Sequence, residues 1–397
     1  MLIPSVIEIL LMLLLLVLAI PVVMLFLEIG IAVLFGGRAN HGVSGEFARA
    51  RIAVLVPAHN EGQGILPTLK DLLGQLEPSD RCLVVADNCD DDTAELARVA
   101  GAEVIERHDL ERRGKGFALD FGIKHLRADP PNVVIMVDAD CRVPDGTVLG
   151  LTHCVQQSRR PCQARSIHDP PSEPLVRHRI AAFAYIVKTY VRPLGLKLMG
   201  GPCGLMGTGM AFPWALIGQR NLATGHIAED ALIGLQLAAE GHGALFCPQV
   251  HVRSTFPTAD ASMDSQSKRW EHGSLQVLRH IVPGLLGKSI RSLDWRLMLL
   301  ALDATVPPLT ALILVIGACC AVTTIPAMLG SWNLLLGSFS LLTVLVISLG
   351  IAWSCYGRDT LHVGDIMKLP FYVVRKLPIY FGLLRGRASS WTRADRD

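Results

Sequence analysis

Long apolar runs lie near both ends of the chain, and the first of them predicts a membrane anchor. No charged residue stands between Glu8 and Glu28. As a helix this run extends roughly 28 Å, about the thickness of one hydrocarbon core. It is longer than the apolar core of a typical signal peptide, and no basic residue precedes it. We therefore expect a retained transmembrane anchor within residues 5–36 rather than a cleaved signal.

The second apolar stretch, near the C-terminus, predicts two further spans. From residue 297 to residue 357 the only charged side chain is Asp303. Glycine, serine and asparagine interrupt the stretch at 330–333. We expect two transmembrane helices within residues 305–355, one on each side of this break.

Between the apolar ends, short apolar runs alternate with segments of helical spacing. The run 51–57 has the composition of a buried parallel strand, and further strands are expected at 82–86, 102–106 and 133–137. Helices are expected between these strands, at 68–76, from the acidic turn at 87–93 to about residue 100, and at 117–127. This alternation predicts an α/β fold with a doubly wound, mostly parallel sheet flanked by helices, in a domain over residues 50–275.

The later part of the chain has a more mixed pattern. We expect helices at 153–160, 177–198 and 230–240, and strands at 162–167 and 243–248. From residue 266 to residue 296 basic and apolar residues alternate at helical spacing, which predicts a helix on the membrane surface, with an interfacial part at 276–300. The basic segment 358–397 is expected to form a cytosolic tail.

Composition and charge agree with a membrane protein. Hydrophobic residues make up 51% of the 397 residues, and the mean hydropathy is +0.40. The net charge of +2 argues against a nucleic-acid-binding protein. Arg38, Arg49 and Arg51 follow the first span, and the third span is also followed by basic residues. We therefore expect a multi-pass protein of a bacterial-type inner (plasma) membrane, with its large middle region in the cytosol.

The ten cysteines are expected to be reduced thiols, because most of them lie in this cytosolic region. Their spacings contain no CxxC pair, so the sequence does not predict a structural zinc site.

Acidic residues follow two of the predicted strands. Asp87 comes directly after the strand 82–86, and Asp138 and Asp140 follow the strand 133–137. The carboxyl ends of parallel strands form the ligand-binding edge of an open α/β sheet. Two carboxylates one residue apart can share a face and hold a divalent cation against a diphosphate. Asp138 and Asp140 are therefore candidate ligands for a divalent cation such as Mg²⁺ or Mn²⁺, with an acidic turn at the strand end as the alternative.

Two later motifs are candidates for proton transfer and for binding phosphate or sugar. Glu229 and Asp230 open a predicted helix, and a carboxylate outside the metal pair can take a proton from an attacking hydroxyl. Gln266, Arg269 and Trp270 share one helical face, where arginine can bind phosphate and tryptophan can stack on a sugar. Helix capping by the acidic pair and interfacial anchoring by Trp270 are the alternatives.

In this order, five motifs resemble those of membrane-bound family 2 glycosyltransferases, which include cellulose, hyaluronan and poly-N-acetylglucosamine synthases. The motifs are Val56–Glu61, Asp87–Asp91, Asp138–Asp140, Glu229–Asp230 and Gln266–Trp270. The resemblance covers about residues 50–275. It implies a GT-A fold, a nucleotide-sugar donor, a divalent metal ion and inversion at the anomeric carbon.

The resemblance also implies roles for individual residues. Asp230 would be the catalytic base and Glu229 would help to position the acceptor. Asp87 would contact the nucleoside, although Ala86 stands where the family usually has a second acidic residue. The other donor-side candidates are Pro57, His59, Glu61, Lys115, Asp138 and Arg269, and the acceptor-side candidates are Gly207, Gln266 and Trp270.

Other functions fit the sequence less well. A nucleotidyltransferase would share the sheet and the metal pair but would not need the two later motifs or the membrane spans. An oxidoreductase would need a glycine fingerprint after the first strand. A transporter, or a non-catalytic partner of one, would be favoured by intramembrane ionisable residues, of which the sequence offers Asp303.

Among transferases two readings stay open. One is synthesis of an exopolysaccharide or cell-envelope glycan, and the other is transfer of one sugar to a ceramide-type or polyprenyl-linked lipid. The expected partners are a nucleotide-sugar, with UDP as the nucleotide, a glycan or lipid-linked acceptor, membrane lipids, and a second copy of the chain or an export partner.

Overall fold

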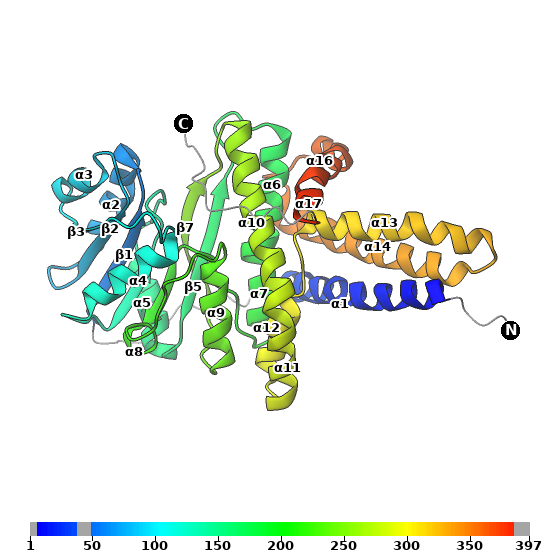
Figure 1. Ribbon diagram of the computed structural model, residues 1–397, viewed down its shortest axis with the longest axis horizontal. Helices are drawn as coiled ribbons and strands as arrows, with labels where there is room; N and C mark the ends of the chain where they lie inside the picture. Colours follow the sequence, from blue (N-terminus) through cyan, green and yellow to red (C-terminus); the bar gives the residue numbers. More distant parts are fainter. Residues whose placement is uncertain (1–5, 38–48, 385–397) are drawn as a thin grey trace. The chain divides into compact units, whose positions relative to one another are not determined.

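The structure is a computed structural model that describes residues 6–37 and 49–384 (Figure 1). The chain divides into two compact units. Of the described residues, the sheet unit comprises 49–171 and 202–273. The helical unit comprises residues 6–37, 172–201 and 274–384. The active-site candidates named above fall in the sheet unit, and the predicted membrane spans fall in the helical unit.

A seven-stranded sheet forms the centre of the sheet unit, with the strand order β3-β2-β1-β4-β6-β5-β7. Adjacent strands are parallel except at β6, which runs antiparallel to β4 and β5. The strands are β1 (Ile52–Ala58), β2 (Arg81–Asp87), β3 (Glu103–Arg107), β4 (Val133–Met136), β5 (Cys162–Asp169), β6 (Met210–Pro213) and β7 (Leu245–Thr255). The predicted mostly parallel α/β sheet is therefore confirmed.

Helices cover this sheet because the inner strands are apolar on both faces. The core of β1, from Ile52 to Val56, is completely buried. Helix α4 approaches this strand closely at Gly122, where a Cβ atom would lie 2.4 Å from a methyl group of Leu55. The helices of the sheet unit are α2 (Leu66–Leu73), α3 (Thr93–Val99), α4 (Lys115–Leu126), α5 (Thr147–Ser158), α8 (Trp214–Ile217) and α9 (Glu229–Ala239), with a 3₁₀ turn at Gly62–Ile65.

Strand β7 is much longer than the expected strand 243–248. Its second half contains Gln249 and Arg253, whose exposed side chains hide the apolar pattern that the prediction used. Val252 and Ser254 face inward and are buried. The backbone of this half pairs with β5 as far as Thr255, after a register shift.

The predicted surface helix at 266–296 is divided into separate helices. These are α10 (Asp260–His280), α11 (Val282–Ser292) and α12 (Trp295–Asp303). A proline lies in the first turn of α11, and Asp294 caps α12 by accepting hydrogen bonds from the next backbone amides. The predicted helix 177–198 forms α6 (Val176–Ile186), a π-helical turn at Val187–Val191, and α7 (Arg192–Leu198).

The helical unit contains three helices that are long and apolar enough to cross a membrane, within the described residues. They are α1 (Val6–Phe35), α13 (Leu309–Met328) and the helix Trp332–Gly357, whose α-helical part is α14 (Trp332–Ala352). The three lie side by side in Figure 1 and share a small core of Leu15, Cys319 and Leu334. Three membrane-spanning helices were predicted, so this expectation agrees with the structure.

Short helices follow the third span: α15 (Val363–Ile366), α16 (Leu369–Arg375) and α17 (Leu377–Leu384). The end of the predicted basic tail, residues 385–397, lies outside the described residues, as does Arg38 in the first basic flank.

A buried charge cluster joins three segments of the helical unit. The Arg192 guanidinium on α7 lies 3.1 Å from the Glu28 carboxylate on α1 and 2.5 Å from that of Asp303 on α12. Glu28 is completely buried, so loss of the arginine would leave a carboxylate without its partner. Asp303 lies on α12, outside the three candidate spans, and has a structural ion pair, so it gives no support to a transporter.

Candidate active site

Acidic groups gather around Lys115 at the carboxyl edge of the sheet. Lys115 is the first residue of α4, and its ammonium group pairs with the Asp138 carboxylate and donates a 2.6 Å hydrogen bond to the Gly207 carbonyl. Burial lowers the pKa of Lys115, but the negative charges of Asp138, Glu229 and Asp230 outweigh it and raise that pKa well above its usual range. Lys115 is therefore a permanent positive charge among these carboxyl groups.

The sheet topology explains why these distant residues meet. Strand β6 runs antiparallel to β4, with Met210 opposite Met136. The residues just before β6 therefore lie beside those just after β4. The backbone amide of Asp138 donates a 3.1 Å hydrogen bond to the Thr208 hydroxyl across this junction. The sequence gives no clear signal for Thr208, because a Gly-Thr-Gly stretch alone is a weak one.

Asp138 and Asp140 are brought together by a turn rather than by continued strand. Strand β4 ends at Met136, and the turn is held by a 2.7 Å hydrogen bond from the Thr68 hydroxyl to the Ala139 carbonyl. One oxygen of each carboxylate and the Cys141 sulfur all lie within 4.8 Å of one another. The predicted pair is therefore placed as a metal site requires, although the face-sharing argument from strand geometry does not apply.

The donor atoms of this turn suit a hard divalent cation. Mg²⁺ and Mn²⁺ prefer carboxylate oxygen. The Cys141 thiol is engaged by the hydroxyls of Thr208 and Ser254, at 3.3 Å and 3.1 Å. Burial, followed by the charges of Asp140 and Asp138, raises the pKa of Cys141 to about 12. The thiol therefore stays protonated near neutral pH, and the two carboxylates are the groups that can hold the ion.

Glu229 and Asp230 stand in the first turn of α9, as predicted. Gly207 has φ +85°, and a Cβ atom there would lie 3.3 Å from a carboxylate oxygen of Asp230, so the loop backbone passes close to this side chain. Burial and the neighbouring Asp230 charge raise the pKa of Glu229 to about 7. Near neutral pH Glu229 can therefore donate a hydrogen bond as a neutral acid.

The loops after β1 and β2 form one connected group. The His59 ring nitrogen Nδ1 lies 2.6 Å from the Asp87 carbonyl oxygen. The backbone amides of Glu61 and Gly62 both donate to the Thr93 hydroxyl, at 2.9 Å and 2.8 Å. Pro57, the other candidate on this side, lies in β1 opposite Val85 of β2. The predicted nucleotide-side residues are thus neighbours.

Arg107, which sequence analysis missed, holds the Asp87 side chain. Its guanidinium lies 2.6 Å from Asp87 Oδ1, and the two side chains are largely buried. Burial raises the pKa of Asp87 although Arg107 opposes this shift. The sequence carried no signal for the contact, because Arg107 ends a different strand and belongs to no motif.

The Gln266, Arg269 and Trp270 side chains come from α10. The Trp270 ring packs edge-on against the His168 ring, with 5.3 Å between the ring centroids. Its centroid lies 6.3 Å from that of Phe256, and these two neighbours stand at the ends of β5 and β7. Farther along α10, a Cβ atom at Gly273 would lie 3.2 Å from Ala228, the residue before the acidic pair. Helix α10 thus packs beside the start of α9, while the binding roles expected for its three motif residues remain predictions.

The fold and these motifs define a GT-A type glycosyltransferase domain. A model of the family described as "Glycosyltransferase like family 2" matches residues 49–273, which is more than half of the chain. The chain therefore belongs to glycosyltransferase family 2. The resemblance inferred from the five motifs, to enzymes that use nucleotide-sugar donors, is confirmed at the level of the family.

Solved structures match parts of this chain at low sequence identity. A mannosyltransferase from Pyrobaculum calidifontis, solved with GDP-Man and Mn²⁺, is 18% identical, with 85% of this chain and 98% of that chain covered and a TM-score of 0.46. Glucosyl-3-phosphoglycerate synthase from Mycobacterium tuberculosis is 19% identical over 57% of this chain and 78% of its own, with a TM-score of 0.38. S. aureus TarS is 13% identical over 66% and 52%, with a TM-score of 0.39. No curated protein matches the chain.

The metal site can be tested with Asp140→Asn. Loss of one carboxylate should weaken Mn²⁺ binding by at least about tenfold, because even outer-sphere changes at metal sites have effects of that order. Titration calorimetry with Mn²⁺ and a nucleoside diphosphate measures this change. Cys141→Ser is the matched control and should leave the affinity nearly unchanged. Equal affinity in the wild type and Asp140→Asn would exclude this carboxylate as a ligand.

The shifted pKa of Glu229 predicts a pH-dependent stability. Between pH 4.5 and about 7 the folded protein keeps this proton whereas the unfolded chain releases it, so Glu229 lowers stability as the pH rises through this window. Glu229→Gln cannot ionise in either state. The variant should therefore gain in melting temperature relative to the wild type as the pH rises from 4.5 to 7. If the melting temperatures of the wild type and Glu229→Gln change with pH in the same way over this range, the raised pKa of Glu229 is contradicted.

Proposed function

We propose that this protein is an inverting, metal-dependent glycosyltransferase that acts at the cytosolic face of a bacterial-type inner membrane. It would move a sugar from a nucleotide-sugar, with UDP as the expected nucleotide, to a polysaccharide or lipid-linked acceptor. The observation that carries the proposal is the grouping of Asp138, Lys115 and Asp230, with Asp140 beside Asp138. Family membership supplies the reaction class.

Asp138 and Asp140 would hold Mg²⁺ or Mn²⁺, which as a Lewis acid would offset the charge of the leaving diphosphate. Lys115 adds a fixed positive charge next to Asp138. On the nucleoside side, the loops that carry His59 and Asp87 would bind the base and ribose, and Arg269 would bind donor phosphate.

Asp230 would take the proton from the attacking acceptor hydroxyl, because inversion requires a base outside the metal pair. With its pKa raised to about 7, part of the Glu229 population is protonated near neutral pH, and this neutral acid can orient the acceptor by donating a hydrogen bond. Gln266 and Trp270 would contact the acceptor or the product, together with the backbone at Gly207.

The acceptor has two candidate classes. The Gln266–Trp270 motif resembles that of polymer-forming synthases, which favours an exopolysaccharide or cell-envelope glycan. The presence of only three candidate spans in the described residues favours transfer of one sugar to a ceramide-type or polyprenyl lipid. For polymer export, a second copy of the chain or an export partner would complete the channel.

Membranes that contain the protein can be incubated with a panel of radiolabelled nucleotide sugars to test this function. Label in a polymer fraction supports glycan synthesis, and label in the lipid fraction supports single transfer. Transfer from none of the sugars, by protein that binds Mn²⁺ and nucleoside diphosphate, would overturn the proposed activity.

Asp230→Asn tests the assignment of the base. General-base assistance contributes about 10²–10⁴ in rate, so turnover should fall by that factor while nucleotide affinity stays nearly unchanged. Asp145→Asn, which alters an exposed loop carboxylate, is the matched control and should retain full turnover. If Asp230→Asn turns over at the wild-type rate, Asp230 has no part in the mechanism. If nucleotide binding is lost together with turnover, Asp230 belongs to the donor site.

The proposed orientation predicts which sites an impermeant thiol reagent reaches in intact cells. Val99→Cys, at an exposed position on α3, should be labelled only after the membrane is opened. Leu329→Cys, exposed in the turn after α13, should be labelled in intact cells. Both are made in a Cys355→Ser background, because Cys355 is exposed. The reverse labelling pattern would invert the proposed topology.

A further inference from the structure

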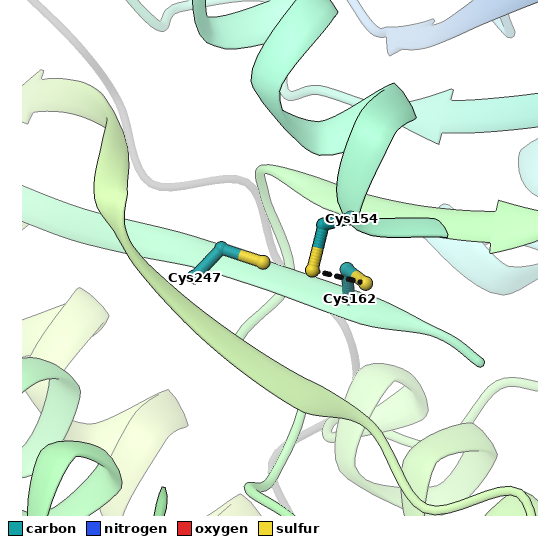
Figure 2. A group of neighbouring side chains, drawn as sticks. All are labelled: Cys154, Cys162 and Cys247. Atoms are coloured by element: carbon teal, nitrogen blue, oxygen red, sulfur yellow. Dashed lines mark hydrogen bonds between the residues drawn. The ribbon is translucent and has the colours of Figure 1, made fainter. Parts of the chain in front are cut away.

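Three cysteines from separate elements, none of them part of the acidic turn, meet in the core of the sheet unit. Figure 2 shows the Cys154 and Cys247 sulfur atoms directed toward Cys162 from a helix and from the neighbouring strand. The three sulfur atoms all lie within 4.8 Å of one another, and those of Cys154 and Cys162 are 2.9 Å apart. Sequence spacing missed this group, because its members are eight and more residues apart and contain no CxxC pair.

The strand register explains why the thiols converge. Strands β5 and β7 are parallel, and Cys247 is the partner of Ala164. Alternate residues of a strand share a face, so Cys162, Ala164 and Cys247 direct their side chains to the same side of the sheet. Helix α5, which carries Cys154, packs on these two strands. The rigid parts of the fold thus hold the three thiols in place.

The surroundings of the cluster favour the binding of a soft metal ion. Cys162 and Cys247 are buried in the apolar core, and Cys154 is half-buried. No carboxylate or imidazole of the described residues belongs to this group of possible ligands. The Ser158 hydroxyl, 3.8 Å from the Cys162 sulfur, is a weak additional contact. Sulfur ligands favour soft metal ions, and a group of three sulfurs lying mutually within 4.8 Å suits a low-coordinate ion better than tetrahedral zinc.

We propose that Cys154, Cys162 and Cys247 form a binding site for a soft, low-coordinate metal ion, of which cuprous copper is the biological representative. Half-buried Cys154 gives the ion access from the surface of α5. With metal–sulfur bonds of about 2.3 Å the sulfur atoms lie nearly 4 Å apart, so Cys154 and Cys162 separate by about 1 Å on binding. The ion exchanges with thiol protons, which leave to solvent, and no electron is transferred.

Metal binding would join α5 to two strands of the sheet. A thiol must release its proton to bind the ion, so binding should be weaker at low pH, where proton release is harder. Strand β7 continues from Cys247 to Ser254, whose hydroxyl contacts Cys141 beside the acidic turn. Because a ligand that binds the folded state stabilises it, the ion should raise the melting temperature of the protein.

The test is a competitive titration of the full chain, purified in detergent under reducing conditions, with Cu(I) and a chromogenic Cu(I) chelator. Excess Mg²⁺ is present throughout to occupy the carboxylate site. We expect one Cu(I) per chain and a rise in melting temperature. Cys162→Ser and Cys247→Ser should each weaken binding by more than about 100-fold, the upper range for changes in outer-sphere groups. Cys82→Ser, an equally buried cysteine outside the cluster, should leave binding unchanged.

Several results would overturn the proposal. One is equal Cu(I) affinity in the wild type and in both cluster variants. Another is binding of Zn²⁺ to the cluster without binding of Cu(I). A third is a Cys154–Cys162 disulfide in the isolated protein, seen by mass spectrometry as the loss of two hydrogens, that takes up no metal after reduction. If the serine variants do not fold, Cys162→Ala and Cys247→Ala replace them, with Cys82→Ala as the control.

Discussion

The ion pair between Lys115 and Asp138 is the interaction on which the rest of the site depends. The negative charges of Asp138, Glu229 and Asp230 would repel one another at the edge of a largely buried region, where solvent screens like charges poorly. The Lys115 ammonium group offsets this repulsion, and it also binds the Gly207 carbonyl. The same side chain therefore fixes the loop backbone beside Asp230. Charge balance and loop position are set by one group.

The sheet topology makes this arrangement possible. Parallel strands β1, β2 and β4 end at one edge and deliver the nucleotide-side loops and the acidic turn there. The antiparallel strand β6 brings the Gly207–Gly209 backbone to the same edge, because its first residue pairs with the last residue of β4. Helices α4 and α9 then contribute Lys115 and the acidic pair from their first turns.

The sequence predicted much of the sheet because the central residues of β1, β2 and β4 are continuously apolar, so their type did not depend on tertiary contacts. It failed for the second half of β7, where exposed Gln249 and Arg253 hide the buried face. Residues in acidic motifs could be found because the chemistry demands a residue type at a fixed spacing. Arg107 and the cluster of Cys154, Cys162 and Cys247 could not be found. Their contacts join separate strands and a helix, and no local sequence pattern indicates how these elements align.

The central claim is that Asp138 and Asp140 hold a divalent cation against the donor diphosphate. The most direct measurement is an experimental structure of the protein with Mn²⁺ and a nucleoside diphosphate, in which anomalous scattering locates the manganese. The account predicts a manganese peak in contact with both carboxylates and with diphosphate oxygens. A bound diphosphate with its manganese away from this pair would contradict it.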